Sequence, residues 1–245
     1  MRCAVIADIH SNPEALTAVL DDIEGQDSID EIWCLGDIVG YGPDPCACIE
    51  IVRQRGIRCV AGNHDWAAIG KLDVEDFNSD AAAANLWTGR QLRPDDVDYL
   101  SELPVVITVG EFTLVHGSPR DPIWEYVVSE YGALISFNYF ETKFCLIGHS
   151  HMPLAFERIG SNGECQCYQL STQTPLSLRE NRLIVNPGSV GQPRDGDPRA
   201  SYIICDLSEG VVWHRRVSYD VVATQERMEQ QGLPPRLASR LSHGL

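Results

Sequence analysis

In its first 65 residues the chain repeats one pattern: a short apolar run, a few polar residues, and then a helix-forming stretch. The three runs cover residues 3–7, 31–35 and 57–61, and the continuous apolar run 3–7 is typical of a strand buried on both faces. Strands separated by helices in this way form parallel βαβ units. The pattern therefore predicts a parallel sheet, which places its ligands beyond the carboxyl ends of its strands.

The helix-forming stretches carry recognisable start signals. Pro13 and Pro45 each stand where a first helical turn is expected, and proline is tolerated there. Ser11 or Asn12 is a candidate cap for the first helix, and Asp44 for the second. These signals support the alternation of strands and helices.

From Pro104 onward the sequence changes to strand-like runs joined by turns. Within one domain covering residues 1–245, we expect residues 119–142 to form an aromatic insert near the site, and residues 219–245 a tail that is helical and then frayed. Alternation followed by hairpins predicts an α/β fold of two packed sheets. The expected strands of this half are 105–109 with 112–115, 144–147, 154–159 with 165–170 around the turn Ser161-Asn162-Gly163, 183–185, and 202–207 with 211–217.

Five of the predicted strands end in side chains that suit a metal ion or a phosphate. His149 and His151 stand two residues apart, and such residues face the same side of an extended chain. Each motif alone is weak, because Asp and Gly-Asp sequences are common in ordinary turns. Their joint occurrence at five strand ends is improbable by chance. The side chains concerned are Asp8, His10, Asp37, Asn63, His64, His116, His149 and His151.

The number and type of these side chains suit two ions. Mixed oxygen and nitrogen ligands favour Mn, Fe, Zn or a similar ion over Mg or Ca. A carboxylate such as Asp37 can bridge two ions, and the amide oxygen of Asn63 adds a neutral ligand. Two dications ~3.5–4 Å apart lower the pKa of a bridging water and clamp both sides of a phosphoryl displacement. The predicted chemistry is hydrolysis of a phosphate ester by a metal-bridging hydroxide.

The order and spacing of these motifs resemble the calcineurin-like metallophosphoesterase superfamily. The stretch from Asn186 to Arg194 resembles its small bacterial and archaeal phosphodiesterase branch. The resemblance implies a four-layer α/β/β/α sandwich of two mixed sheets with the metals at the strand ends. The motifs that carry it are Asp8-x-His10, Gly36-Asp37, Gly62-Asn63-His64-Asp65, His116 and Gly148-His149-Ser150-His151.

The resemblance also implies roles for individual residues. His64 and Asp65 would be catalytic: His64 would contact the phosphate and protonate the leaving oxygen, and Asp65 would be a supporting partner of the site. Asn63 would contact the substrate as well as a metal. Both ions would be divalent, with Mn expected in vitro and Fe, Zn or Ni as alternatives. One ion would be held by Asp8, His10, Asp37 and His151, and the other by Asp37, Asn63, His116 and His149.

Further substrate contacts are predicted near the motifs. Arg120 and Arg194 are candidates for phosphate binding, because phosphate sites favour the forked guanidinium group, although both suit a solvated surface equally well. Trp124 and Tyr126 are the aromatic residues of the insert nearest His116 in sequence. The insert's aromatic side chains could stack on a substrate, pack in the core, or form a contact in a homo-oligomer.

Composition restricts the partners. The chain has 19 basic and 35 acidic residues, a net charge of −16, which disfavours stable nucleic-acid complexes and anionic membranes. No apolar run approaches the ~18 residues of a membrane span, and no secretory signal is recognisable. Nine cysteines without a CxxC pair are expected to be reduced thiols of a cytoplasmic protein. A small phosphate ester is the partner that these observations favour.

Three functional hypotheses remain after the sequence is read. The first is a phosphodiesterase acting on a small phosphodiester or nucleotide, and the second is a phosphomonoesterase or dinucleoside-polyphosphate hydrolase. The third is a non-catalytic metal-binding scaffold, as in a retromer subunit of the superfamily that lacks the catalytic histidine, which here is His64. The superfamily's protein-phosphatase branch carries Asp-Arg-Gly where this chain has Asp37-Ile38-Val39, which disfavours a phosphoprotein substrate.

Overall fold

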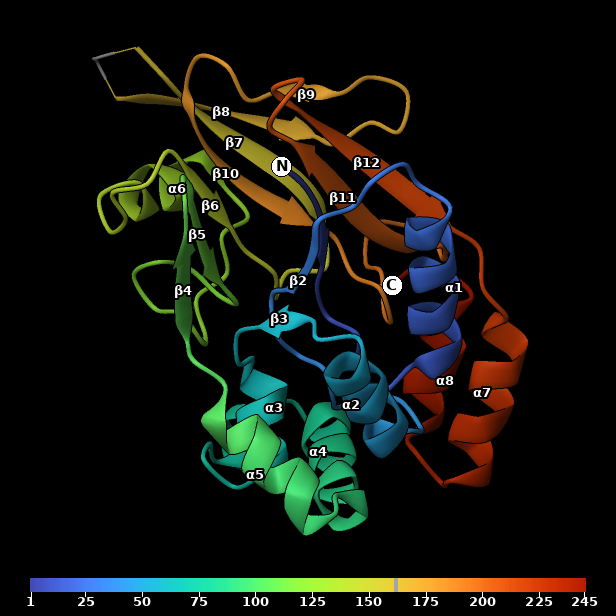
Figure 1. Ribbon diagram of the computed structural model, residues 1–245. Coiled ribbons are helices and arrows are strands. Elements are labelled where there is room, and N and C mark those ends of the chain that lie inside the picture. The colour runs from blue at the N-terminus through green and yellow to red at the C-terminus, as the bar shows by residue number, and fades with distance from the viewer. Residues whose placement is uncertain (161–162) are drawn as a thin grey trace.

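The computed structural model describes residues 1–160 and 163–245, which form two mixed six-stranded sheets (Figure 1). In the first sheet the order is β3–β2–β1–β11–β12–β9. β1, β2 and β3 are parallel, as the alternation predicted, and β11 pairs antiparallel with β1. The strands are β1 (Arg2–Ile6), β2 (Glu31–Cys34), β3 (Arg58–Cys59), β9 (Leu176–Ser177), β11 (Ala200–Asp206) and β12 (Val211–Val217).

The second sheet contains the predicted hairpins, in the order β4–β5–β6–β10–β7–β8. β6 lies parallel to both β5 and β10, while the β4–β5 and β7–β8 pairs are antiparallel. Ser161 and Asn162 of the turn expected between β7 and β8 lie outside the described residues. The strands are β4 (Val106–Val109), β5 (Phe112–Val115), β6 (Phe144–Leu146), β7 (Pro153–Ile159), β8 (Glu164–Gln169) and β10 (Arg182–Pro187).

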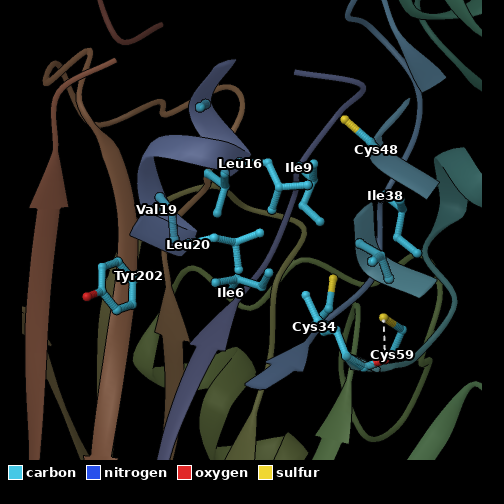
Figure 2. Packing of buried hydrophobic residues seen from close by; sticks show 14 of the residues in the cluster. Ile6, Ile9, Leu16, Val19, Leu20, Cys34, Ile38, Cys48, Cys59 and Tyr202 are labelled. Atoms are coloured by element: carbon cyan, nitrogen blue, oxygen red, sulfur yellow. Dashed lines mark hydrogen bonds between the residues drawn. The ribbon is translucent and has the colours of Figure 1, made fainter. Parts of the chain in front are cut away.

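Strand β1 shows how the layers are built. Cys3 and Val5 pack between the two sheets, whereas Ala4 and Ile6 pack on the outer face of the first sheet, because side chains alternate along a strand. Figure 2 shows the outer cluster, in which Ile6 meets Leu16 and Leu20 of the first helix. The helices over this face include α1 (Pro13–Glu24) and α2 (Pro45–Gln54).

The fourth layer is short. α6 (Glu130–Ser136) covers the outer face of the second sheet, where Phe137 and Phe140 pack with Phe156. The α/β/β/α sandwich of two mixed sheets is thus confirmed. For the aromatic insert, the structure places these two phenylalanines in the core and leaves Tyr131 and Tyr139 exposed.

Two helical regions complete the chain. After β3 come α3 (Asn63–Ala68), a 3₁₀ turn (Val74–Asp76), α4 (Ser79–Gln91) and α5 (Pro94–Glu102). At the other end, α7 (Val221–Gln230) packs against α1, and α8 (Pro235–Leu241) packs against α7 (Figure 1). The expected frayed tail is wrong, because Leu237 and Leu241 of α8 are buried against Met228 and Tyr41.

Across the described residues, none of the helices has both the length and the apolar character needed to span a membrane.

Candidate metal centre

The side chains predicted to bind metal meet where the strand ends of the two sheets face each other. On the side of the first sheet, these side chains come from the loops after β1 and β2 and from the start of α3. On the side of the second sheet, they come from the loops after β5 and β6. All of these residues are buried: Asp8, His10, Asp37, Asn63, His116, His149 and His151.

The first cluster consists of Asp8, His10 and His151, whose ligand atoms all lie within 4.8 Å of one another. The Nε2 atoms of His10 and His151 are 3.1 Å apart. The Nε2 atom of His151 is 3.5 Å from Oδ1 of Asp8. Two residues from the first sheet and one from the second therefore offer three donor atoms to one point.

The second cluster consists of Asp37, His116 and His149, with the same 4.8 Å spread. Nε2 of His116 is 3.2 Å from Nδ1 of His149 and 2.9 Å from Oδ1 of Asn63. Oδ2 of Asp37 lies 3.3 Å from this Nε2 and 3.7 Å from Nε2 of His10 in the first cluster. Asp37 thus lies between the two clusters.

Hydrogen bonds fix the orientation of all four histidine rings. One nitrogen of each ring contacts a backbone carbonyl, which can only accept, so that nitrogen carries the proton. In a neutral ring the other nitrogen then carries a lone pair and can bind a cation. The proton-bearing contacts are Nδ1 of His10 to Val39, Nδ1 of His151 to Gln192, Nδ1 of His116 to Leu35, and Nε2 of His149 to Trp124, at 2.6–3.1 Å.

This arrangement fits two cations. Lone pairs of His10 and His151 face each other at 3.1 Å, and ring nitrogens of His116 and His149 face each other at 3.2 Å. Facing lone pairs repel, but a cation between them is bound by both. Buried Oδ2 atoms of Asp8 and Asp37 have no hydrogen-bond partner among the described residues. A bound dication would compensate the cost of burying these two carboxylates.

Burial and charge act on this centre in opposite directions. Burial raises the pKa of Asp8 to about 7, whereas burial lowers the pKa of His10, His149 and His151. Burial also opposes ionisation of Asp37, but the imidazoles of His116 and His64 hold its pKa well below the usual range. Burial opposes protonation of His116, but the Asp37 carboxylate raises the pKa of that imidazole to about 9, so a cation would displace its Nε2 proton. The other three imidazoles are neutral, and beside the carboxylates they form a donor set suited to dications.

The backbone is strained at the same residues. Of the eight non-glycine residues with positive φ in the described chain, seven lie in the loops of this centre. Such strain is held only where surrounding structure over-determines it, and it clusters at functional sites. The seven residues are Asp8, His10, Ser11, Asp37, Tyr41, His149 and His151.

The positive φ values show that the expectation that His149 and His151 face the same side of an extended chain is wrong. His149 (φ 66°) and His151 (φ 58°) follow the end of β6 in left-handed conformations, so the rule for extended chains does not apply to them. Their side chains enter different clusters, His149 beside His116 and His151 beside His10. Asp8 accepts the His149 N–H at 3.1 Å, which helps to hold this turn.

His64 lies beside the two clusters, in the first turn of α3. Its backbone N–H donates to Oδ1 of Asp37 at 2.8 Å, and its Nδ1 contacts Oδ1 of Asn85 at 2.9 Å. The amide oxygen accepts, so Nδ1 carries the proton and Nε2 is the free nitrogen. Burial lowers the pKa of His64 to about 4, although Asp37 raises it in part.

Asp65 lies behind the two clusters and acts on the site through the backbone. Its Oδ2 accepts the N–H groups of Asp37 and Gly62, each at 2.9 Å, and its Oδ1 accepts that of Val39 at 3.1 Å. A Cβ on Gly62 would overlap the Asp37 carboxylate, so only glycine fits beside this clamp. Asp65 holds the loop that carries Asp37.

The predicted substrate residues divide into two groups. Arg194 donates to Oε1 of Gln192 at 3.0 Å and to the Tyr41 hydroxyl at 3.4 Å, beside the clusters. Tyr126 stacks on His149 with ring centroids 3.8 Å apart, and the Trp124 ring is 6.3 Å from the same histidine. Arg120, in contrast, forms an ion pair with Glu125.

Sequence reasoning missed two residues that shape the centre. Asn85 orients His64 from the buried face of α4, and the only sequence signal was a polar residue within an alanine-rich helical stretch. Tyr41 packs against His10 at 4.7 Å and His64 at 4.3 Å between ring centroids. Its turn-rich loop gave no sign of this contact.

Comparison with known proteins agrees with this geometry. A model for the calcineurin-like phosphoesterase superfamily domain matches residues 1–210. An uncharacterized protein of Methanocaldococcus jannaschii is 39% identical over 247 residues, covering 98% of this chain and 97% of that protein. A crystal structure of a metallophosphoesterase from Sphaerobacter thermophilus is 43% identical with a TM-score of 0.90, covering 100% of this chain and 99% of that one.

A more distant relative matches in part. The symmetrical bis(5'-nucleosyl)-tetraphosphatase of Erwinia tasmaniensis is 34% identical over 108 residues, which are 41% of this chain and 36% of that protein. The match therefore spans little more than a third of that relative's length.

Proposed function

This chain belongs to the calcineurin-like phosphoesterase superfamily, and we propose that it is a phosphodiesterase that hydrolyses a small phosphodiester or nucleotide with two bound divalent cations. The observation that carries the proposal is the pair of clusters around Asp37, in which the ring nitrogens of four histidines converge on two points. Two cations would neutralise the charge of a phosphate and lower the pKa of a bound water.

The chain's own residues divide the work in this proposal. Asp8, His10, Asp37 and His151 would hold one ion, and Asp37, Asn63, His116 and His149 would hold the other. His64 keeps its Nδ1 proton on Asn85 and presents Nε2 to the substrate, where it can carry the proton for the leaving oxygen. A bound phosphate raises the low pKa of His64 toward the working range by placing negative charge beside it.

Manganese is the ion that we propose for assays, because mixed carboxylate and imidazole ligands suit it. We propose the cytoplasm as the location. All nine cysteines are free thiols, and six of them are buried. Free thiols of this number are typical of proteins in a reducing compartment.

A second candidate, a dinucleoside-polyphosphate hydrolase, is favoured by the partial match to a bis(5'-nucleosyl)-tetraphosphatase. Both candidates use the same centre and differ in the substrate. A panel of aryl phosphodiesters, nucleotides and dinucleoside polyphosphates separates them by kcat/KM. The scaffold hypothesis predicts no turnover of any of these compounds.

The deciding experiment is hydrolysis of bis(p-nitrophenyl) phosphate by wild-type protein and by His64→Ala, each loaded with Mn²⁺. We expect kcat to fall about 10²–10⁴-fold in the variant, the range of a general acid. Bound metal is expected to stay, because Asp37 accepts from the backbone of residue 64 and not from its ring. Wild-type protein inert with Mn, Fe, Zn, Ni and Co would refute the proposal, and metal loss in parallel with activity would refute the role of His64.

A further inference from the structure

A second pocket, which we call the arginine pocket, opens beside the metal centre. It has a volume of about 570 Å³, within the range of small-molecule sites, and α8 forms one of its walls. Three arginines line it: Arg194 from the loop after β10, and Arg236 and Arg240 from α8. Tyr41 and Tyr126 also line it.

These two tyrosines connect the arginine pocket to the metal centre. Tyr126 stacks on His149 at 3.8 Å, and Tyr41 lies 4.7 Å from His10, both between ring centroids. The Arg194 guanidinium lies 5.7 Å from the centre of the Tyr41 ring. A ligand with one group at the histidines could therefore place its next group among the arginines.

Positive charge gathers in the arginine pocket. Among the described residues, Arg194, Arg236 and Arg240 form no ion pair with an Asp or Glu side chain; of the other 14 arginines, nine form such a pair and five do not. The buried Nε of Arg194 has no hydrogen-bond partner in the described part of the chain. Burial and then the nearby charge of Arg194 lower the pKa of Arg240. Asp80 is the acidic side chain that lines the pocket.

The surrounding structure holds α8, which carries two of the arginines, in place. Gln225 of α7 donates to the carbonyl of Ala238 and to the Ser242 hydroxyl, each at 2.8 Å, which fixes α8. Arg240 also donates to the main-chain oxygen of Leu245. Asn78, the N-cap of α4, and Ser79 in its first turn also line the pocket, so the positive end of a 13-residue helix adds to the field.

We propose that the arginine pocket is a second anion site, which holds the neighbouring phosphate of a substrate whose scissile phosphate lies at the metal centre. The preferred substrate then carries linked phosphates, as in a nucleoside or dinucleoside polyphosphate. This inference rests on the proposed function and narrows its substrate class. Water adds to the scissile phosphorus, the bond to the leaving oxygen breaks with its electron pair on that oxygen, and the leaving oxygen takes a proton.

The first test is binding of inorganic tripolyphosphate to the metal-free protein, measured by calorimetry in the presence of a chelator. We compare wild type with the double variant Arg236→Ala/Arg240→Ala, and with the matching double lysine variant. The control double variant, Arg53→Ala/Arg90→Ala, removes the same charge from exposed positions that do not line the pocket.

Wild type should bind tripolyphosphate more tightly than inorganic phosphate. The Kd for tripolyphosphate should rise about 10–100-fold in the alanine variant, because two charged donors to the phosphate oxygens are lost. The lysine variant should recover part of the loss, and the control should match wild type. Equal binding by wild type and the alanine variant, or an equal loss in the control, would overturn the arginine pocket as an anion site.

The second test is the ratio of kcat/KM for ADP to that for bis(p-nitrophenyl) phosphate. This ratio should fall about tenfold in the alanine variant, and a ratio equal to that of wild type would overturn the assignment of substrate class. If wild type turns over neither compound, the proposed function fails. The binding test then still decides whether the anion site exists, so the two failures remain distinguishable.

Discussion

His64 depends on a single side chain for the orientation of its ring. Oδ1 of Asn85 accepts the Nδ1 proton at 2.9 Å, and both residues are buried. We expect Asn85→Ala to lower kcat about 10–100-fold with unchanged metal content, because a misplaced general acid loses most of its effect. Asn85→Asp keeps the acceptor and adds negative charge, so the pH profile of kcat should move to higher pH. An alanine variant as active as wild type would contradict this positioning role.

His214 is a buried histidine outside the metal centre, bonded through Nε2 to the Ser201 hydroxyl at 2.8 Å. Burial lowers its pKa from the ordinary value of 6.5 to about 4. The unfolded chain therefore takes up a proton below pH 6.5 that the folded protein accepts only near pH 4, so stability falls as the pH falls through this window. The contribution lost is about 2–3 kcal/mol.

Urea unfolding of wild type and His214→Gln at several pH values checks this expectation. Glutamine can keep a donor for Ser201 but does not titrate. Its free energy of unfolding should therefore depend less steeply on pH between 6.5 and 4. Parallel curves for the two proteins would show that His214 does not carry this dependence.

At the scale of elements, the two predicted helix starts have different anchors. Asn12 caps α1, accepting the Ala15 N–H at 3.1 Å, and also donates to the carbonyl of Gly191 at 3.0 Å. Asp44 stands at the start of α2 but makes no capping hydrogen bond, and its carboxylate pairs with Arg227 of α7 instead.

Alanine substitution at Asn12 and at Asp44 should lower the free energy of unfolding by different amounts. Asn12→Ala is expected to cost about 1–3 kcal/mol, since it removes a cap and leaves the Gly191 carbonyl buried without its donor. Asp44→Ala loses a partly exposed ion pair and should cost about 1 kcal/mol or less. Chemical denaturation midpoints measure both. Equal losses would mean that the contact to Gly191 contributes little.

The sequence predicted some of the strands and helices, and it missed those that depend on tertiary packing. Apolar runs located β1, β2, β5 and β6, and the residues at their ends located the metal centre, because strand ends at one edge of a sheet necessarily converge. The six-residue helix α3 was missed, since Asn63 to Ala68 carries too few apolar side chains for a helical period. The tail was expected to be helical but to fray where α8 lies, because the burial of α8 depends on tertiary contacts such as that with Tyr41. Partners such as Asn85 are likewise set by tertiary packing.

At the scale of the molecule, both sheets are needed to complete the metal centre. Asp8, His10 and Asp37 come from the first sheet, while His116 and the histidines after β6 come from the second. In the metal-free protein the facing lone pairs and buried carboxylates oppose this closure. A bound cation therefore links the two halves of the sandwich and should stabilise the whole fold.

The last prediction follows from this linkage. Adding Mn²⁺ to chelator-treated protein should raise the free energy of unfolding by about 2.7 kcal/mol when the free ion is at 100 times its Kd, visible as a rise in Tm. Asp37→Asn should lose most of this rise, because Asp37 reaches both clusters, and His116→Ala should do the same from the second sheet. Asp98→Asn, an exposed carboxylate of α5, is the matched control and should keep the full rise. If Asp37→Asn responds to Mn²⁺ as wild type does, the ion binds elsewhere and Asp37 does not join the two halves.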